Sequence, residues 1–209
     1  MTQHLAVLNI KAIIKQAIRD NFLPGLVLQL FALCVVLIYF LYPPAKNTFQ
    51  FIAELKSAHN ASFAMISTAL FGGVMPFIFQ FVKHKVPAPV HLHLLFNVVL
   101  WACMGLLIDS FYQFQALIFG SDNDLATIIK KTLFDQFVFS VVITSPILTA
   151  LYIWKETNFY WQHTISTLRA DYWKERLPAT ILSTWIVWLP AVTLIYAMPP
   201  ALQLPLFNL

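Results

Sequence analysis

Charged residues are scarce in this chain. Asp, Glu, Lys and Arg make up 11% of its 209 residues, whereas soluble domains carry about 25%. Hydrophobic residues make up 59% of the chain, and the mean hydropathy is +0.73. This composition excludes a soluble globular protein and predicts an integral membrane protein. No polar stretch is long enough to fold as a separate globule, so we expect a single membrane domain.

Glycine and cysteine are scarce as well. The five glycines are too few for a phosphate-binding loop, and the sequence has no G-x-S-x-G or H-E-x-x-H motif. The two cysteines, Cys34 and Cys103, lie in apolar stretches and predict neither a disulfide framework nor a Cys-rich metal site. We therefore expect no metal, no cofactor and no enzymatic activity. An intramembrane enzyme that uses Asp109 as a base stays open as a minor alternative.

The basic residues do not form a nucleic-acid-binding face. The net charge is +4, but the Lys and Arg residues are scattered over short polar segments, which argues against a nucleic acid as partner. Most of them lie in residues 1–21, 83–93 and 155–178. The positive-inside rule then predicts that the N-terminus faces the cytoplasm or its topological equivalent.

Long apolar runs predict five transmembrane helices. Crossing a bilayer core of about 30 Å takes roughly 20 helical residues. Runs of this length are residues 22–42, 61–82, 94–119, 133–154 and 179–198. We expect a polar connector over residues 45–60, a surface helix over residues 155–178 and an apolar tail after Pro199. The predicted fold class is an all-α integral membrane protein.

The N-terminal segment, residues 1–21, has an amphipathic pattern. Lys11, Lys15 and Arg19 share one helical face, and isoleucines occupy another. This pattern is typical of a helix that lies in the membrane interface with its cations among the lipid head groups. A removed targeting segment is the alternative, but there is no small-residue cleavage pattern before the first span.

A polar stripe marks the fourth predicted span. Gln136, Ser140 and Thr144 follow one another at four-residue steps, which places them on one face of an α-helix. Pro146 comes soon afterwards and predicts a kink. The stripe either forms hydrogen bonds between helices or borders a water-lined path. Asp135 stands beside it, one helical turn after Lys131, and we expect these two to form an interfacial pair.

Two further polar residues fall inside apolar runs. Asp109 lies near the middle of the third predicted span, where a carboxylate costs about 2.5–3.5 kcal/mol. Alternatively, the span ends at Ile108 and Asp109 lies at the interface. Gln80 adds an amide to the second span, which also carries Thr68 and Gly72 at a spacing typical of close helix packing.

Two segments of the chain carry a resemblance to a known family. The first segment has a lysine pair followed by an acidic–amide pair. The second segment has a tryptophan–proline pattern. The matching residues are Lys130, Lys131, Leu133, Asp135, Gln136, Trp185, Trp188, Pro190, Tyr196 and Pro199. From Phe49 onward the chain resembles the family of the mitochondrial inner-membrane protein Mpv-seventeen and the peroxisomal membrane protein twenty-two.

This resemblance implies a membrane domain over residues 45–209, preceded by an extra span over residues 22–44 that typical members lack. The chain also departs from the family pattern at Met75-Pro76 and at Leu106, as a distant branch would. Family members are multi-pass proteins of organelle membranes, and some pass small solutes.

We therefore expect a weakly selective pore or transport-type protein for small solutes. The candidate residues of the polar path are Asp109, Gln136, Ser140, Thr144 and Gln80. A structural membrane protein without conduction is the alternative. The expected partners are the lipid bilayer and small solutes, and self-association stays open. The sequence does not distinguish a bacterial inner membrane from a mitochondrial or peroxisomal membrane.

Overall fold

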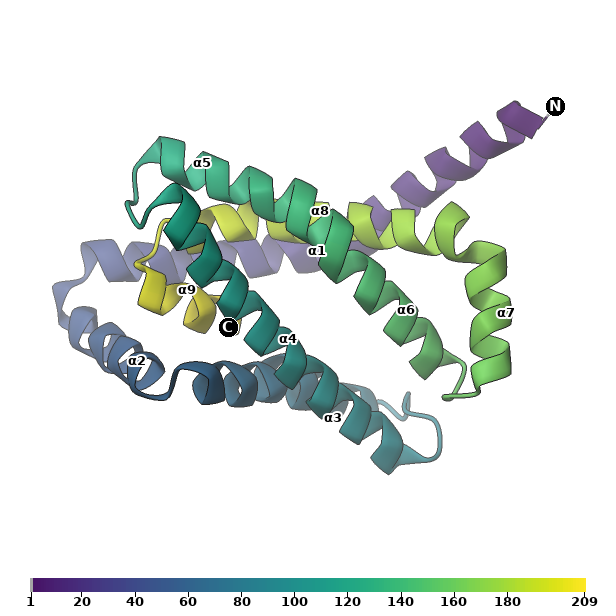
Figure 1. Ribbon diagram of the computed structural model, residues 1–209, viewed down its shortest axis with the longest axis horizontal. Coiled ribbons are helices and arrows are strands. Elements are labelled where there is room, and N and C mark those ends of the chain that lie inside the picture. Colours follow the sequence, from purple (N-terminus) through teal and green to yellow (C-terminus); the bar gives the residue numbers. More distant parts are fainter. Residues whose placement is uncertain (1) are drawn as a thin grey trace. The chain divides into compact units, whose positions relative to one another are not determined.

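The chain is helical throughout the part that the structure describes. The computed structural model describes residues 2–209, with side-chain environments from residue 12 onward, and within this range it has no strand. Figure 1 shows the helices, which are α1 (Thr2–Leu41), α2 (Lys46–Thr68), α3 (Met75–Val82), α4 (Val90–Phe119), α5 (Leu125–Phe134), α6 (Ser145–Glu156), α7 (Trp161–Asp171), α8 (Leu177–Tyr196) and α9 (Pro200–Phe207).

The described residues include five helical stretches that are long and apolar enough to cross a membrane. They are Ala12–Leu41, Pro43–Val82, Val90–Phe119, Leu125–Glu156 and Trp161–Tyr196. Each overlaps one of the five predicted spans. The prediction of an all-α protein with five candidate membrane spans is confirmed, and these spans indicate an integral multi-pass membrane protein.

The segment that we expected to be a polar connector, residues 45–60, is helical. It forms most of α2, which continues past Asn60 into the second predicted span. The backbone of Asn60 is not helical, with φ 36° and ψ −106°, so a kink separates the polar part of α2 from the apolar part. The predicted span begins at Ala61, directly after this kink. The expected C-terminal tail also folds, as helix α9.

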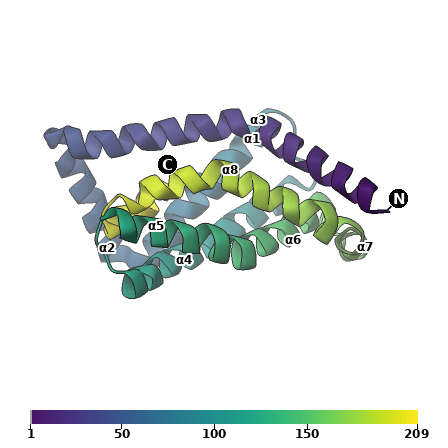
Figure 2. The ribbon, with the colours of Figure 1, turned by 90° about the horizontal axis from the view of Figure 1, so that it is seen from above.

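The contacts within the chain divide it into two compact units. Unit 1 comprises Met1–Phe31 and Thr132–Thr193, and unit 2 comprises Ala32–Lys131 and Leu194–Leu209. The N-terminal segment and the first span form one continuous helix, α1, with Pro24 inside it. Figure 2 shows the sharp corner at Pro43-Pro44, where α1 gives way to α2 in unit 2.

In unit 1, α1 packs against α8. A Cβ atom on Gly25 would lie 3.3 Å from Val187 Cγ2, so the small residue allows close approach. Two amides strengthen this contact. Gln29 Nε2 donates to the Val187 carbonyl oxygen at 3.1 Å, and Asn21 Nδ2 donates to Ser183 Oγ at 2.9 Å. The short helix α7 connects the end of α6 with the start of α8 (Figure 1).

In unit 2, α2 and α4 meet at Gly105. A Cβ atom added there would collide with the backbone oxygen of Ala64 and with Thr68 Oγ1. Thr68 is completely buried and donates its hydroxyl hydrogen to Asn208 Oδ1 at 2.9 Å. Asn208 Nδ2 in turn donates to Ser67 Oγ at 2.8 Å. Hydrogen bonds between polar side chains therefore hold the C-terminal end of α9 against α2.

The described part of the chain contains three π-helical stretches, η2 (Ala69–Val74), η3 (Asp135–Thr144) and η4 (Tyr172–Arg176). Each of them ends two residues before a proline, namely Pro76, Pro146 and Pro178. Proline lacks the backbone donor, and its ring collides with the carbonyl group four residues earlier. Widening the preceding turn to the π-helical pattern relieves this conflict. We predicted a kink at Pro146, and the helix there is irregular over η3.

Asp124 caps the first turn of α5. Its Oδ1 accepts hydrogen bonds from the backbone N–H groups of Ala126 at 3.0 Å and Thr127 at 3.1 Å. The hydrogen bonds from the Thr127 side chain and the Thr127 backbone lower the pKa of Asp124 below its ordinary value of 3.8. The charged carboxylate is thus the form that the helix start favours.

A pH titration is expected to show this cap directly. Because the folded pKa is lowered, the stabilisation is complete above the ordinary pKa and is lost as the pH falls through the folded value. The amide resonances of Ala126 and Thr127 should shift together with a midpoint below 3.8. Asp124→Asn should abolish the shift, whereas Asp122→Asn should leave it. A midpoint at or above the ordinary value would contradict the cap.

Candidate functional site

A buried ion pair joins α2 to α4 in unit 2. Lys56 Nζ lies 2.8 Å from Asp109 Oδ1 and 3.1 Å from Asp109 Oδ2. The exposed fractions of the two side chains are 9% and 6%. Gln113, one turn further along α4, donates from Nε2 to Asp109 Oδ2 at 2.8 Å. The carboxylate is thus bound by a cation and an amide while it is shielded from solvent by protein.

The packing of α2 on α4 determines which residue meets Asp109. Gly73 lies against the Asn97 backbone, Gly72 against the Trp101 ring, and Gly105 against Ala64. The two helices therefore run antiparallel. Continuing this alignment brings the next turns of α4 beside the polar start of α2.

Lys56 precedes the kink at Asn60 by one turn, so it stands just outside the second predicted span. Asp109 contacts it from α4. Both residues lie within helical stretches that are long and apolar enough to cross a membrane, Pro43–Val82 and Val90–Phe119. The side chain of Asp109 is buried in the protein, and its place inside the span or at the interface stays a prediction.

The sequence indicated Asp109 but not its partner. We assigned Lys56 to a connector, because its neighbours are polar. The two residues are 53 positions apart, and no periodic rule links them. A buried carboxylate requires a compensating cation or donor. That requirement predicts that Asp109 has a partner among the basic residues. Which basic residue this is depends on how the two helices are rotated and aligned.

The polar stripe Gln136–Ser140–Thr144 lies in unit 1, on the π-helical stretch η3, and all three residues are buried. Ser140 Oγ donates to Asp135 Oδ1, five residues earlier, at 3.5 Å, and Gln136 Nε2 donates to the same oxygen at 2.9 Å. Thr144 Oγ1 donates to the Ser140 carbonyl oxygen at 3.5 Å. The five-residue step is the repeat of a π-helix. The carboxylate of Asp135 is thereby part of the polar cluster.

Two buried polar atoms near this cluster have no hydrogen-bond partner among the described residues. They are Gln136 Oε1 and Ser145 Oγ. Most buried polar side-chain atoms in proteins do have a partner. The hydrogen bonds within the cluster therefore leave these two atoms unsatisfied.

Residues from the two family-like segments contact each other within each unit. In unit 1, Trp185 Nε1 donates to the Gln136 carbonyl oxygen at 2.9 Å, and the Trp185 ring lies 5.0 Å from the Phe137 ring. In unit 2, Lys131 Nζ lies 6.0 Å from the centre of the Tyr196 ring. Trp185 and Tyr196 therefore contribute to the packing of the helices within their units.

The other predicted residues occupy varied positions. Gln80 on α3 and Lys130 on α5 are exposed. Pro190 lies inside α8, and Pro199 precedes α9. Trp188 lines a cavity in unit 1. Asp109 and Gln80 belong to unit 2, and the Gln136–Ser140–Thr144 stripe belongs to unit 1.

Among the described residues, no group of three or more His, Cys, Asp and Glu side chains is placed to bind a metal ion. Compared with models of protein families, with curated proteins and with solved structures, the chain has no match.

Proposed function

We propose that this protein passes small solutes across a membrane with weak selectivity, and that the Lys56–Asp109 ion pair is a charged element of its passage. The buried pair is the observation that supports this proposal. It lies between α2 and α4, within two helical stretches that are long and apolar enough to cross a membrane. Charged residues within membrane-spanning helices are rare, and they usually mark paths for ions, protons or polar substrates.

Helix packing alone does not require such a pair. Replacing a buried ion pair by well-packed apolar side chains of similar volume often leaves a protein equally stable or makes it more stable. Apolar residues at positions 56 and 109 are therefore expected to join α2 to α4 without a large loss of stability. A retained pair of opposite charges suits a role in which one or both groups interact with a passing solute.

The resemblance to the Mpv-seventeen family supports the same function, and we propose a distant membership. The contacts Gln136–Trp185 and Lys131–Tyr196 bring the two family-like segments together. A motif whose distant halves form contacts is more informative than scattered matches. The family includes proteins that pass small solutes, which is why we favour this function here.

The topology that we propose places the N-terminus on the cytoplasmic side or its equivalent. The basic residues 11–19 would then lie among the head groups of that leaflet, with residues 1–21 as an interfacial helix. The loop at Pro43-Pro44 and the ion pair would face the opposite side. The membrane itself is a bacterial inner membrane or that of an organelle.

Ion selectivity in reconstituted vesicles tests the function. Asp109→Asn leaves the Lys56 charge unpaired, so the permeability ratio should shift toward anions. Lys56→Met leaves the Asp109 charge unpaired, so the ratio should shift toward cations. The double variant removes both charges and should return the ratio to the wild-type value. The measurement is the reversal potential under a salt gradient, normalised to incorporated protein.

Several outcomes separate the proposal from its alternative. A wild-type protein that passes no solute would remove the pore hypothesis. If the protein conducts but the permeability ratio is the same in all of these variants, the ion pair is not part of the passage. The pore hypothesis itself would then stand. Thr144→Val, which removes one hydroxyl group from the stripe in unit 1 at nearly constant volume, tests that cluster separately.

A structural role is the second candidate, and the packing around Gly105 favours it. The ion pair continues a tightly packed contact that includes Ala64 and Thr68. On this view, the pair specifies how α2 and α4 align, and no solute passes. Zero flux through the wild-type protein, together with destabilised Lys56→Met and Asp109→Asn variants, would support it.

A further inference from the structure

A polar cavity opens in unit 1 between α1 and the start of α8. Its volume is about 400 Å³, within the range of small-molecule sites. The polar residues that line it are Asn21, Arg176, Thr180, Ser183 and Thr184, and Trp188 lines it further along α8. Arg176 and Trp188 are twelve positions apart along the helix, which corresponds to about 18 Å along its axis. The cavity thus has one cationic end and extends along a predicted span.

A second cavity adjoins the first. Its volume is about 270 Å³, and it shares Arg176 and Thr180 with the polar cavity. Apolar side chains of α6, namely Leu148, Tyr152 and Ile153, supply much of its lining. Together the two cavities offer a cation, hydroxyl groups and an apolar wall around one point, which suits an amphiphile better than a simple ion.

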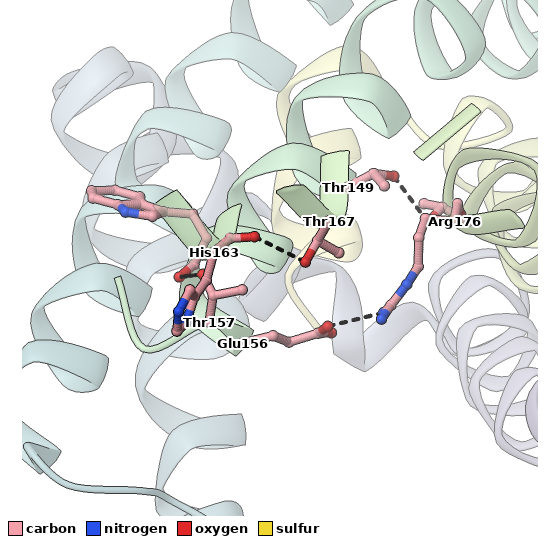
Figure 3. A network of polar contacts seen from close by, with 8 residues as sticks. Thr149, Glu156, Thr157, His163, Thr167 and Arg176 are labelled. Atoms are coloured by element: carbon pink, nitrogen blue, oxygen red, sulfur yellow. Dashed lines mark hydrogen bonds and ion pairs between the residues drawn. The ribbon is translucent and has the colours of Figure 1, made fainter. Parts of the chain in front are cut away.

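Arg176 is held in place but remains accessible. Its Nη1 donates to Glu156 Oε2 at 2.9 Å, and 45% of its side chain is exposed. Figure 3 shows the Arg176 side chain extending toward Glu156, with Thr149 close by. A guanidinium group has five N–H donors. The single bond to Glu156 therefore leaves donors for a second anion.

Three predicted span boundaries converge on these cavities. Asn21 directly precedes the first span, Glu156 follows the fourth, and Arg176 precedes the fifth. Asn21 lines the first cavity, Glu156 lines the second and Arg176 lines both, so the three boundaries lie near one another in unit 1. Span boundaries mark the level of the lipid head groups. The positive-inside rule assigns this side to the cytoplasm, where the leaflet is rich in anionic lipid.

We propose that these two adjoining cavities bind one anionic phospholipid. The phosphate group interacts with Arg176 and with the hydroxyl group of Thr184, because the Thr180 hydroxyl hydrogen is already donated to the Arg176 carbonyl oxygen. An acyl chain lies along Leu148 and Ile153. The site is independent of the Lys56–Asp109 pair, which belongs to unit 2.

Native mass spectrometry of the full-length protein in detergent tests this site. With dioleoyl phosphatidylglycerol as the probe, we expect one lipid to be retained per chain, and retention of phosphatidylcholine to be weaker. Arg176→Gln should weaken phosphatidylglycerol binding about tenfold, because a charge-assisted contact is lost. Glu156→Gln should strengthen binding, since it removes the carboxylate that competes for Arg176.

Lys174→Gln is the matched control. It removes one positive charge from the same π-helical stretch, but Lys174 does not line either cavity, so binding should not change. If Arg176→Gln unfolds, Thr184→Val provides the second variant, with weaker binding expected. A thermal unfolding midpoint for each variant separates binding from stability.

Four results would overturn the proposal. The first is an equal loss of binding in Lys174→Gln, which would indicate general surface charge. The second is a loss in both Arg176→Gln and Glu156→Gln, which would indicate a purely structural ion pair. The third is equal retention of the anionic and zwitterionic lipids. The fourth is displacement of the lipid by an equal concentration of inorganic phosphate, which would mean that free phosphate is the ligand.

Discussion

Lys56→Met is expected to destabilise the folded protein by about 3–5 kcal/mol, because it leaves the carboxylate of Asp109 buried without its cation. The Lys56 and Asp109 side chains are only 9% and 6% exposed, so solvent cannot replace the missing charge without opening the contact between α2 and α4. Gln113 would keep one hydrogen bond to the carboxylate. Chemical unfolding in detergent, followed by circular dichroism, measures the change.

Two variants serve as controls for this result. Lys46→Met removes a lysine from the exposed start of the same helix and should change stability by less than about 0.5 kcal/mol. Lys56→Met combined with Asp109→Leu removes both charges, and it should recover most of the loss. If the single and double variants were equally unstable, the cost would come from lost packing and not from the unpaired charge.

Gly105→Ala is expected to be the most damaging of the glycine-to-alanine substitutions compared here. The new methyl group would collide with the backbone oxygen of Ala64 and with Thr68 Oγ1. Backbone atoms in a packed helix cannot move aside as a side-chain tip can, so α2 and α4 must separate. Overpacking of this kind costs about 1–3 kcal/mol. The unfolding midpoint in detergent should fall accordingly.

Gly72→Ala and Gly25→Ala complete the series. A Cβ atom on Gly72 would lie 2.6 Å from the Trp101 ring, and one on Gly25 would lie 3.3 Å from Val187 Cγ2. The Trp101 ring can turn away at some cost, and the Val187 contact needs only a small shift. We therefore expect the order Gly105, Gly72, Gly25 in decreasing effect. A larger effect for Gly25 than for Gly105 would contradict the packing described for α2 and α4.

The amino-acid sequence alone determined the class of protein and the number of candidate spans. Both depend on the composition and length of apolar runs, which are local and additive properties. Two local signals also coincide with features of the backbone. Pro43-Pro44 follows the end of α1, and the predicted second span begins directly after the kink at Asn60. Sequence patterns also indicated Asp109 and the Gln136–Ser140–Thr144 stripe as unusual.

Only the tertiary structure decided the partners of those residues. Lys56 meets Asp109 because Gly105 lets α2 and α4 approach and thereby determines their alignment. Ser140 meets Asp135 because the helix widens before Pro146, which shifts the four-residue spacing to five. Hydropathy is summed along the chain, whereas a contact depends on the rotation and alignment of two helices. That information lies in the packing of all the side chains between them, and no single segment of the sequence contains it.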